Sequence, residues 1–338
     1  MGAIVLYWAV TTLVGTVWSG PLDPPAAPAE TQRTQITSLP FTISSPGSYV
    51  VMADLTCTAC GAGASGITVA AEDVTIDFNG FAIRGVAGSG DGIVVTGSRT
   101  GVAVRNGFVN DWTGKGINFT TCSRCRVEDL DASDNSDVGV HIGASSIVSN
   151  VMSTGNSIGI MLNGHGNVLR DSIVEGGIFG IWVALGSNGN LVEGNVVRGA
   201  STGVMVSSNE NSILGNISNL NAIYGFSIDG DANSIVENSS NSNSNDGFRI
   251  NGDANSIVEN SADSDSLDGF VVTGVGNSIV ENSSNNVNVG FDIGGAGNLV
   301  VRNIVQGVSV LAFQIGGGNT VGLLETGTPF NPWANIAH

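Results

Sequence analysis

The sequence predicts an all-β solenoid, a right-handed parallel β-helix of 11 or 12 coils with about 22 residues in each coil. The first of three observations behind this prediction is a glycine followed by an apolar residue, which recurs at spacings of 24, 23, 20, 21, 23, 22, 22, 22 and 21 residues. A sustained period in this range indicates a repeat architecture. The pair begins at Gly92, Gly116, Gly139, Gly159, Gly180, Gly203, Gly225, Gly247, Gly269 and Gly290.

The second observation is a pair of asparagines, five residues apart, that keeps step with the glycines. The first column contains Asn190, Asn211, Asn233, Asn255, Asn277 and Asn298, and the second contains Asn195, Asn216, Asn238, Asn260, Asn282 and Asn303. An asparagine at a tight turn tolerates the left-handed conformation and bonds the backbone, and stacked amides can bond from coil to coil. We therefore expect both columns to be structural.

The third observation is the alternation of apolar residues inside each repeat, as in Gly-Phe226-Ser-Ile228. A period of two indicates strands, and Ile235-Val236 begins a second short β-branched run in the same repeat. The asparagine, aspartate, serine and glycine residues between these runs favour turns. No helical apolar stripe follows residue 35, which disfavours a leucine-rich repeat, and a propeller blade needs about 40 residues.

Matching residues of successive coils should form ladders, because neighbouring strands lie about 4.8 Å apart. We expect one aromatic stack and one aliphatic ladder inside the solenoid. The stack would contain Phe226, Phe248, Phe270, Phe291 and Phe313, and the ladder Ile228, Ile250, Val272, Ile293 and Ile315.

Two segments resemble known β-helix proteins. Residues 233–274 read NSIVENSSNSNSNDGFRINGDANSIVENSADSDSLDGFVVTG, and the first coils contain ITSLPFTISSPGSYVV and GITVAAEDVTIDFNGFAIRG. They resemble the PbH1-type parallel β-helix repeats of the bacterial group that includes NosD-like periplasmic proteins, pectate-lyase-like enzymes and the alginate epimerase scaffold. The resemblance covers residues 36–325. It implies the architecture and leaves the chemistry open, because unrelated activities share this scaffold.

The ends of the chain differ in composition from the repeats. We divide the chain into an apolar leader or signal peptide (1–20), a Pro/Ala-rich linker (21–35), the β-helix domain (36–325) and a C-terminal tail (326–338). The apolar run in the leader is short for a membrane span, so we expect none in the mature chain. An exported protein, secreted, periplasmic or at the cell surface, is expected; an uncleaved anchor is the alternative.

The net charge of the chain limits the classes of partner that it can bind. Asp and Glu total 29 against 11 Lys and Arg, a net charge of −18. Simple phosphate attraction is then excluded, so we expect no nucleic-acid partner. A strongly acidic surface suits a protein that must stay dissolved outside the cell or one that collects cations.

Four cysteines form two CxxC motifs, Cys57–Cys60 and Cys122–Cys125. One zinc ion would need all four sulfurs about 2.3 Å away. The two motifs fall about three coils apart, roughly 14 Å at the ordinary strand spacing. Two local disulfides are expected in an exported chain; zinc and free or redox-active thiols are the alternatives.

The outward residue two places after each glycine forms a row along one face. Four consecutive members, His141, Met161, Trp182 and Met205, make an uncharged strip on an acidic rod. An exposed tryptophan can stack on a sugar ring, and an apolar strip can equally contact a protein or lie under a tail. We expect a binding face here, with Trp182 at least half covered; the alternative is a strip without a role.

Carboxylates also stack. Glu237, Glu259 and Glu281 form one column, with Arg302 next in line. Like charges one coil apart repel by roughly 1 kcal/mol in a watery setting, and calcium prefers such oxygen ligands. No cofactor is required by the sequence; a calcium site at these glutamates and a merely solvated acidic surface are the two interpretations.

Catalytic motifs are mostly absent. The best group is Lys115, the only lysine, beside Asp111 and with Asp91 one coil earlier. A lyase would combine such carboxylates with a lysine or arginine base. These three residues are our weak catalytic candidates.

The regularity of the last coils favours a scaffold over an enzyme, because catalytic grooves often interrupt a repeat with long loops. We therefore expect an exported, non-enzymatic scaffold whose extended face binds a polysaccharide or associates with neighbouring copies. The alternative is a polysaccharide lyase, C5-epimerase or glycoside hydrolase of the same fold.

Overall fold

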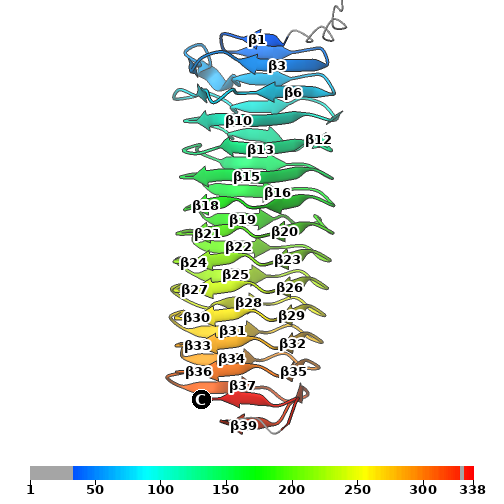
Figure 1. The fold of residues 1–338 in the computed structure, drawn as a ribbon, viewed down its shortest axis with the longest axis vertical. Helices are drawn as coiled ribbons and strands as arrows, with labels where there is room; N and C mark the ends of the chain where they lie inside the picture. The colour runs from blue at the N-terminus through cyan, green and yellow to red at the C-terminus, as the bar shows by residue number, and fades with distance from the viewer. Residues whose placement is uncertain (1–32, 328–330) are drawn as a thin grey trace, which may run out of the picture. The chain divides into compact units, whose positions relative to one another are not determined.

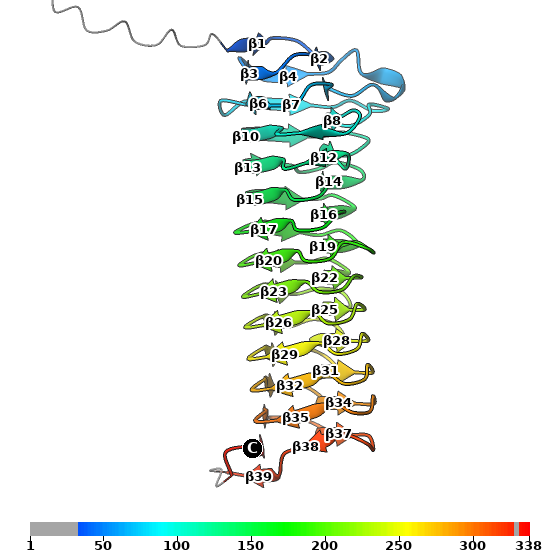
Figure 2. The same cartoon turned by 90° about the vertical axis from the view of Figure 1, so that its right-hand side faces the viewer.

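The computed structural model describes residues 33–327 and 331–338. The leader and residues 21–32 of the linker lie outside these residues. Parallel strands stack coil upon coil through the described part of the chain, as Figures 1 and 2 show. A regular coil gives one strand to a 13-stranded sheet and two strands to a 25-stranded sheet. The predicted parallel β-helix is confirmed, with 13 coils rather than 11 or 12.

The first and last coils lack the glycine that precedes the apolar residue in the other coils. The first strand of the 13-stranded sheet starts at Phe41 without a preceding glycine, and the last has Ala312 where other coils have glycine. The strands of this sheet are β2 (Phe41–Ile43), β5 (Ile67–Val69), β8 (Ile93–Val95), β11 (Ile117–Phe119), β14 (Val138–Ile142), β16 (Ile158–Leu162), β19 (Phe179–Val183), β22 (Thr202–Val206), β25 (Tyr224–Ile228), β28 (Phe248–Ile250), β31 (Asp268–Val272), β34 (Val289–Ile293) and β37 (Leu311–Ile315).

The 25-stranded sheet consists of two rows that merge in three long strands, β10 (Ala103–Asn110), β13 (Arg126–Asp131) and β15 (Ile147–Thr154). The first row also contains β1 (Thr34–Ile36), β3 (Gly47–Val51), β6 (Val74–Asp77), β17 (Val168–Arg170), β20 (Leu191–Glu193), β23 (Ser212–Leu214), β26 (Ser234–Val236), β29 (Ser256–Val258), β32 (Ser278–Val280), β35 (Leu299–Val301) and β38 (Thr320–Val321).

The second row holds β4 (Leu55–Thr56), β7 (Ala82–Arg84), β18 (Ile173–Glu175), β21 (Val196–Arg198), β24 (Ile217–Asn219), β27 (Ser239–Asn241), β30 (Ser261–Asp263), β33 (Ser283–Asn285), β36 (Ile304–Gln306), β39 (Leu324–Thr326) and β40 (Asn335–Ala337). A two-stranded sheet of β9 (Arg99–Thr100) and β12 (Cys122–Ser123) and one 3₁₀ turn, η1 (Gly61–Gly63), complete the described elements. Among the described residues, no helix is long and apolar enough to cross a membrane.

The recurring glycine is required by close packing inside the solenoid. A Cβ added to Gly225 would lie 2.3 Å from Ser240 Oγ and 2.8 Å from the carbonyl oxygen of Gly247. Both contacts are shorter than real Cβ contacts, and one of the neighbours is backbone. A side chain at this position would therefore force neighbouring coils apart.

The predicted aromatic stack is confirmed. Ring centroids along the five phenylalanines from Phe226 to Phe313 are 4.7, 4.7, 4.7 and 5.2 Å apart, with planes within 3–7° of parallel. The aliphatic ladder beside it has the predicted register, for example Ile228 to Ile250. Offset or tilted pairs are the usual preference of aromatic rings, so strand stacking imposes this parallel arrangement.

Both asparagine columns are buried and bond from coil to coil, as predicted. The backbone N–H of Asn233 donates to Oδ1 of Asn255 (2.7 Å), and that of Asn238 donates to Oδ1 of Asn260 (2.9 Å). The expected left-handed conformation belongs instead to the residue before the asparagine, such as Glu237 with φ of 55°. The side-chain oxygen of each asparagine therefore accepts a hydrogen bond from the backbone of the preceding coil.

A third buried column was missed. It contains Asn135 and Asn156 and then, after a break in which Ala200 takes the position before Asn221, it continues through Asn221, Asn243 and Asp265. The N–H of Asn243 donates to Oδ1 of Asp265 (2.8 Å), so an aspartate takes the place of an asparagine at the end of this column.

The C-terminal segment folds back into the sheet. β40 pairs on one side with β36 and on the other with β39, which precedes it in sequence. Asn335 continues the second asparagine column, since the N–H of Asn303 donates to its Oδ1 (3.0 Å). Part of the segment we assigned to the tail thus forms a strand of the solenoid.

Candidate functional site

The outer face of the 13-stranded sheet carries the predicted binding strip. Its four residues occupy paired positions in consecutive coils, from His141 to Met161, Trp182 and Met205. A second outward column, formed by the residue before each glycine, runs beside it and contributes Val138, Ile158 and Phe179. The middle of this face is consequently apolar.

Trp182 is partly buried by its own chain. Its ring lies 5.3 Å from that of Phe179 at an angle of 43°, and its Nε1 donates to Ser207 Oγ (3.1 Å). These contacts fix the indole in one orientation and leave part of it open to solvent. No tail, neighbouring copy or glycan is needed to account for the cover that we expected over Trp182.

An amino-terminal cluster lies at one end of the strip, formed by Asp91, Lys115, Asn118, Asp137 and His141. Lys115 Nζ donates to Asp137 Oδ2 (2.8 Å), and the Lys115 backbone N–H donates to Asp91 Oδ1 (2.8 Å). Asn118 Nδ2 donates to the other oxygen of Asp91 (2.7 Å). Three turns preceding strands β8, β11 and β14 bring these charged groups together.

His141 is the unusual member of this cluster. Its side chain is 8% exposed, and neither ring nitrogen has a hydrogen-bond partner. Burial, together with the positive charge of Lys115, lowers the pKa of His141 to about 4. The imidazole is therefore neutral at physiological pH, with a free lone pair on one nitrogen.

Two of the three catalytic candidates meet in this cluster and the third does not. Lys115 and Asp91 are hydrogen-bonded as described, whereas Asp111 lies 3.7 Å from Arg84. Asp137 takes the position beside the lysine amine. The sequence pattern did not single out Asp137, because it lies two residues before its glycine rather than one.

A carboxy-terminal cluster, formed by Tyr224, Asp246, Arg249, Asp268 and Asp292, lies at the other end of the strip. Arg249 Nη1 donates to the Tyr224 hydroxyl, and its guanidinium carbon is 5.2 Å from the centre of that ring. Asp246 is 6% exposed; burial and the nearby Asp268 raise its pKa to about 6. Burial also raises the pKa of Asp268.

The sequence contained a signal for this second cluster. Asp246 and Asp268 stand directly before their glycines, and Arg249 and Asp292 stand two residues after theirs. Joining the two outward columns, which share one face, would have placed the charged residues together.

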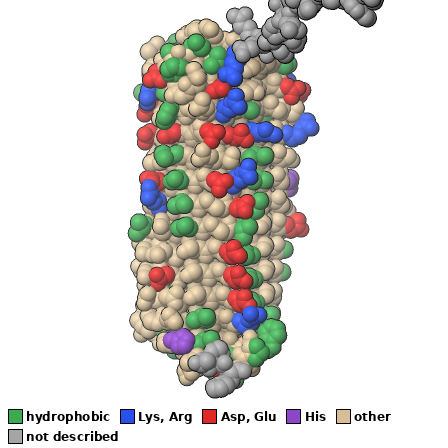
Figure 3. Space-filling model, viewed as in Figure 1, with side chains coloured by type: hydrophobic (Ala, Val, Ile, Leu, Met, Phe, Trp, Pro, Cys, Tyr) green, Lys and Arg blue, Asp and Glu red, His purple; other side chains and the backbone are tan. Residues whose placement is uncertain are grey.

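The predicted glutamate column lies in the turns between the two rows of the 25-stranded sheet. Glu237, Glu259 and Glu281 have φ of 55°, 57° and 58°, and Arg302 bonds Glu281 at the end of the column. Figure 3 shows such a row of acidic side chains ending in a basic one. No group of three His, Cys, Asp or Glu side chains suited to a metal ion occurs in residues 33–327 and 331–338.

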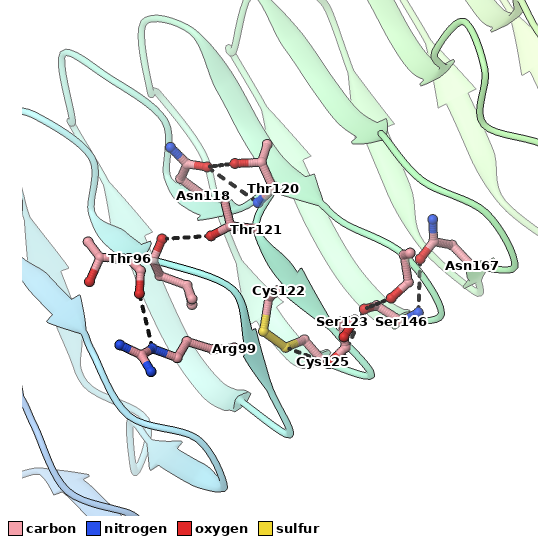
Figure 4. Close-up of a disulfide and its surroundings, with 12 residues drawn as sticks. Thr96, Arg99, Asn118, Thr120, Thr121, Cys122, Ser123, Cys125, Ser146 and Asn167 are labelled. Carbon is pink, nitrogen blue, oxygen red and sulfur yellow. Dashed lines mark hydrogen bonds between the residues drawn. A yellow bond between two sulfur atoms is a disulfide. The ribbon is translucent and has the colours of Figure 1, made fainter.

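The cysteines are joined within each motif, Cys57 to Cys60 and Cys122 to Cys125. Figure 4 shows the second disulfide and its surroundings. The N–H of Cys125 donates to Ser146 Oγ (3.0 Å), and the N–H of Ser146 donates to Asn167 Oδ1 (2.9 Å). This disulfide thus adjoins the ladder of polar side chains that links successive coils.

A cavity of about 460 Å³ opens on the other sheet. Its lining includes Phe108, Met152, Ile173, Asp129 and Asp131, and none of the residues singled out from the sequence. The cavity therefore lies outside the predicted binding strip, which is on the outer face of the 13-stranded sheet.

Two family models match the chain. One is described as "Right handed beta helix region" and matches residues 55–197; the other is described as "Periplasmic copper-binding protein (NosD)" and matches residues 144–303. A comparison with curated proteins gives no match.

Solved structures with the same fold include an enzyme module and phage tailspikes. The A-module of mannuronan C-5 epimerase AlgE4 from Azotobacter vinelandii is 14% identical, with a TM-score of 0.71 over 82% of this chain and 91% of that one. A tailspike protein of Escherichia coli bacteriophage HK620 is 10% identical, with a TM-score of 0.60 over 77% of this chain and 59% of that one. At these identities the likeness concerns the fold alone.

Proposed function

This chain is a right-handed parallel β-helix repeat protein. We propose that it is an exported scaffold and that its outer face binds an extended polysaccharide. The apolar leader at residues 1–20 and the word periplasmic in one matching family description support export. The fold positions a straight row of side chains, one per coil, which suits a repeating polymer.

The observation that carries this proposal is the orientation of Trp182. Contacts with Phe179 and Ser207 hold its ring on the outer face, and part of the ring remains open. A pre-oriented aromatic ring loses little conformational entropy when a sugar ring stacks on it. Mannuronan, named in the description of the epimerase, is itself a polysaccharide.

The test compares two tryptophan variants, Trp182→Ala and Trp333→Ala, against a panel of soluble polysaccharides by affinity electrophoresis and calorimetry. Trp333 is 60% exposed and lies in the C-terminal segment, away from the strip, so it is the matched control. We expect Trp182→Ala to weaken binding about tenfold, about 1.4 kcal/mol, and Trp333→Ala to bind like the wild type. Equal binding by both variants would remove Trp182 from the site.

The carboxy-terminal cluster favours a second candidate function, glycoside hydrolysis. Glycosidases need one protonated and one ionised carboxyl group flanking the bond. Asp246, with its pKa raised to about 6, would serve as the acid, and Asp268 or Asp292 as the second carboxylate. Lyase or epimerase chemistry at Lys115 and Asp91 is the remaining enzymatic proposal.

Reducing ends released from the same panel test the hydrolase. Activity should fall above about pH 6, as Asp246 loses its proton, and Asp246→Asn should abolish it. The exposed Asp229→Asn is the charge-matched control. Activity that survives in Asp246→Asn would eliminate this assignment.

Calcium at Glu237, Glu259 and Glu281 remains a proposal. A divalent cation would relieve repulsion between Glu237 and Glu259, which lack the arginine partner of Glu281. Millimolar calcium should then raise the melting temperature, EDTA should reverse the rise, and Glu259→Gln should abolish it. If neither calcium nor EDTA changes the melting temperature, these glutamates are solvated surface residues and not a calcium site.

A further inference from the structure

The cavity of about 460 Å³ on the 25-stranded sheet is lined by exposed apolar side chains. It lies over β10, β13 and β15, the three long strands in which the two rows of this sheet merge. Phe108, Met152 and Ile173 line it and are 42%, 46% and 39% exposed. Cavities of this volume hold small organic ligands in other proteins.

One carboxylate interrupts this apolar lining. Asp131 is paired with Phe108 in the preceding coil and with Met152 in the following coil, so the three residues share one outward column. Its Oδ1 is shielded from solvent and has no hydrogen-bond partner among the described residues. No lysine or arginine in the described part of the chain forms an ion pair with it. A ligand that brings a positive N–H donor would supply the missing partner.

The other charged residues of the lining also favour a cation. Asp129 and Asp171 line the cavity, and no lysine, arginine or histidine is among its lining residues. Asp129 already accepts a hydrogen bond from Asn150 Nδ2 (2.6 Å). No group of three His, Cys, Asp or Glu side chains suited to a metal ion occurs in the described residues, and aromatic or aliphatic side chains offer a metal no ligand atom. The lining is therefore complementary to an organic cation that carries an apolar group.

We propose that this cavity binds a small organic cation in which a protonated primary amine is attached to an apolar body. The ammonium group donates to the carboxylate of Asp131, because charge-assisted hydrogen bonds are the strong ones. It also lies beside Phe108, since the face of an aromatic ring attracts a cation. The apolar body covers Met152 and Ile173, which are paired in neighbouring coils, and removes their exposed surface from water.

The proposed ligand differs from the polysaccharide both in its chemistry and in its place on the protein. The strip that contains Trp182 belongs to the 13-stranded sheet, whereas the residues that line the cavity belong to the 25-stranded sheet and its turns. A sugar has neither the positive charge nor the apolar body that this lining favours. Asp131→Asn should therefore bind polysaccharide as the wild type does, and Trp182→Ala should bind the organic cation as the wild type does.

The test titrates the full chain with phenethylammonium as the probe, measured by calorimetry and by ligand-observed NMR. We expect one site per chain. Asp131→Asn should weaken binding at least about tenfold, because a hydrogen bond to a charged group is stronger than one to a neutral group. Phe108→Ala should weaken it as well, since the ring contact is lost. The exposed Asp229→Asn removes the same charge outside the cavity and should leave the affinity unchanged.

Two further probes separate the positive charge from the apolar contact. Phenethyl alcohol keeps the ring and lacks the charge, and putrescine keeps the ammonium groups and lacks an apolar end. Each should bind the wild type at least about tenfold more weakly than phenethylammonium does. Thermal melts without ligand establish that the variants fold. The proposal is overturned if the wild type does not bind phenethylammonium at millimolar concentration, if Asp131→Asn binds it equally well, or if either comparison probe binds as tightly.

Discussion

At the scale of single residues, the buried polar side chains link one coil to the next. Most of these residues are asparagines, whose side-chain oxygen accepts a backbone N–H. In the second column the amide NH2 also donates, as from Asn238 Nδ2 to the carbonyl oxygen of Ile213, whereas Nδ2 of Asn233, Asn255 and Asn277 has no hydrogen-bond partner in the described part of the chain. Asp265 is the exception: it is 2% exposed and can only accept when ionised. Burial raises its pKa to about 6.

Asp265→Asn should stabilise the protein, in a pH-dependent way. Because the folded pKa of about 6 lies above the ordinary value of 3.8, the native state holds the proton more tightly than the unfolded chain. Stability is therefore full below about pH 4 and is lost as the pH rises through about 6. The shift corresponds to an amount on the order of 2–3 kcal/mol.

Melting temperatures of the wild type and Asp265→Asn should agree near pH 4 and differ most at pH 8, where the variant is the more stable. The exposed Asp229→Asn removes the same charge and should show no such divergence. If Asp265→Asn is destabilised at pH 8, the carboxylate is needed as a double acceptor for Asn243 and Ser240.

At the scale of strands, the structural features that repeat from coil to coil could be predicted from the sequence. The period of Phe226, Phe248 and Phe270 determines strand, register and inward direction together, since a slip by one residue would turn all of them outward. The two charged clusters do not repeat. Lys115 meets Asp137, and Tyr224 meets Arg249, through residue types that occur once at their position and are not repeated from coil to coil.

The Phe stack should dominate the stability of its part of the solenoid. Phe248→Ala leaves a cavity between two stacked rings, so the free energy of unfolding should fall by about 3–5 kcal/mol. Phe108→Ala, on the outer surface of the other sheet, is the control and should cost much less. Chemical denaturation measures both values; similar losses for the two variants would mean that the stack adds nothing beyond ordinary burial.

At the scale of the whole β-helix, the ends pose a different problem from the middle, because a terminal strand exposes unpaired backbone groups. The segment of residues 331–338 reduces this exposure by placing β40 against β36. The sequence distinguished this segment only as part of a C-terminal tail, residues 326–338. The sequence could not show that β40 lies between β36 and β39, because β40 follows β39 in the chain but precedes it in the order of the sheet.

Deleting residues 331–338 should promote association. The deletion removes β40 and leaves β36 unpaired on one side, together with the backbone N–H of Asn303. Light scattering should show larger species than for the full chain, and Trp333→Ala, which keeps the strand, should not. A truncated protein that remains monomeric at the same concentration would show that the end needs no cap.

The ladders of Phe and Asn side chains also determine how the molecule would respond to a pulling force. Each coil bonds to the coil before it and the coil after it, so the chain should peel from a pulled end one coil at a time rather than rupture as a block. Every released coil of 22 residues in the regular part adds at most about 75 Å of extended chain. A single-molecule force–extension curve should therefore show force peaks at equal increments of extension while residues 203–290 unfold. The increments should become unequal where the coil lengths vary.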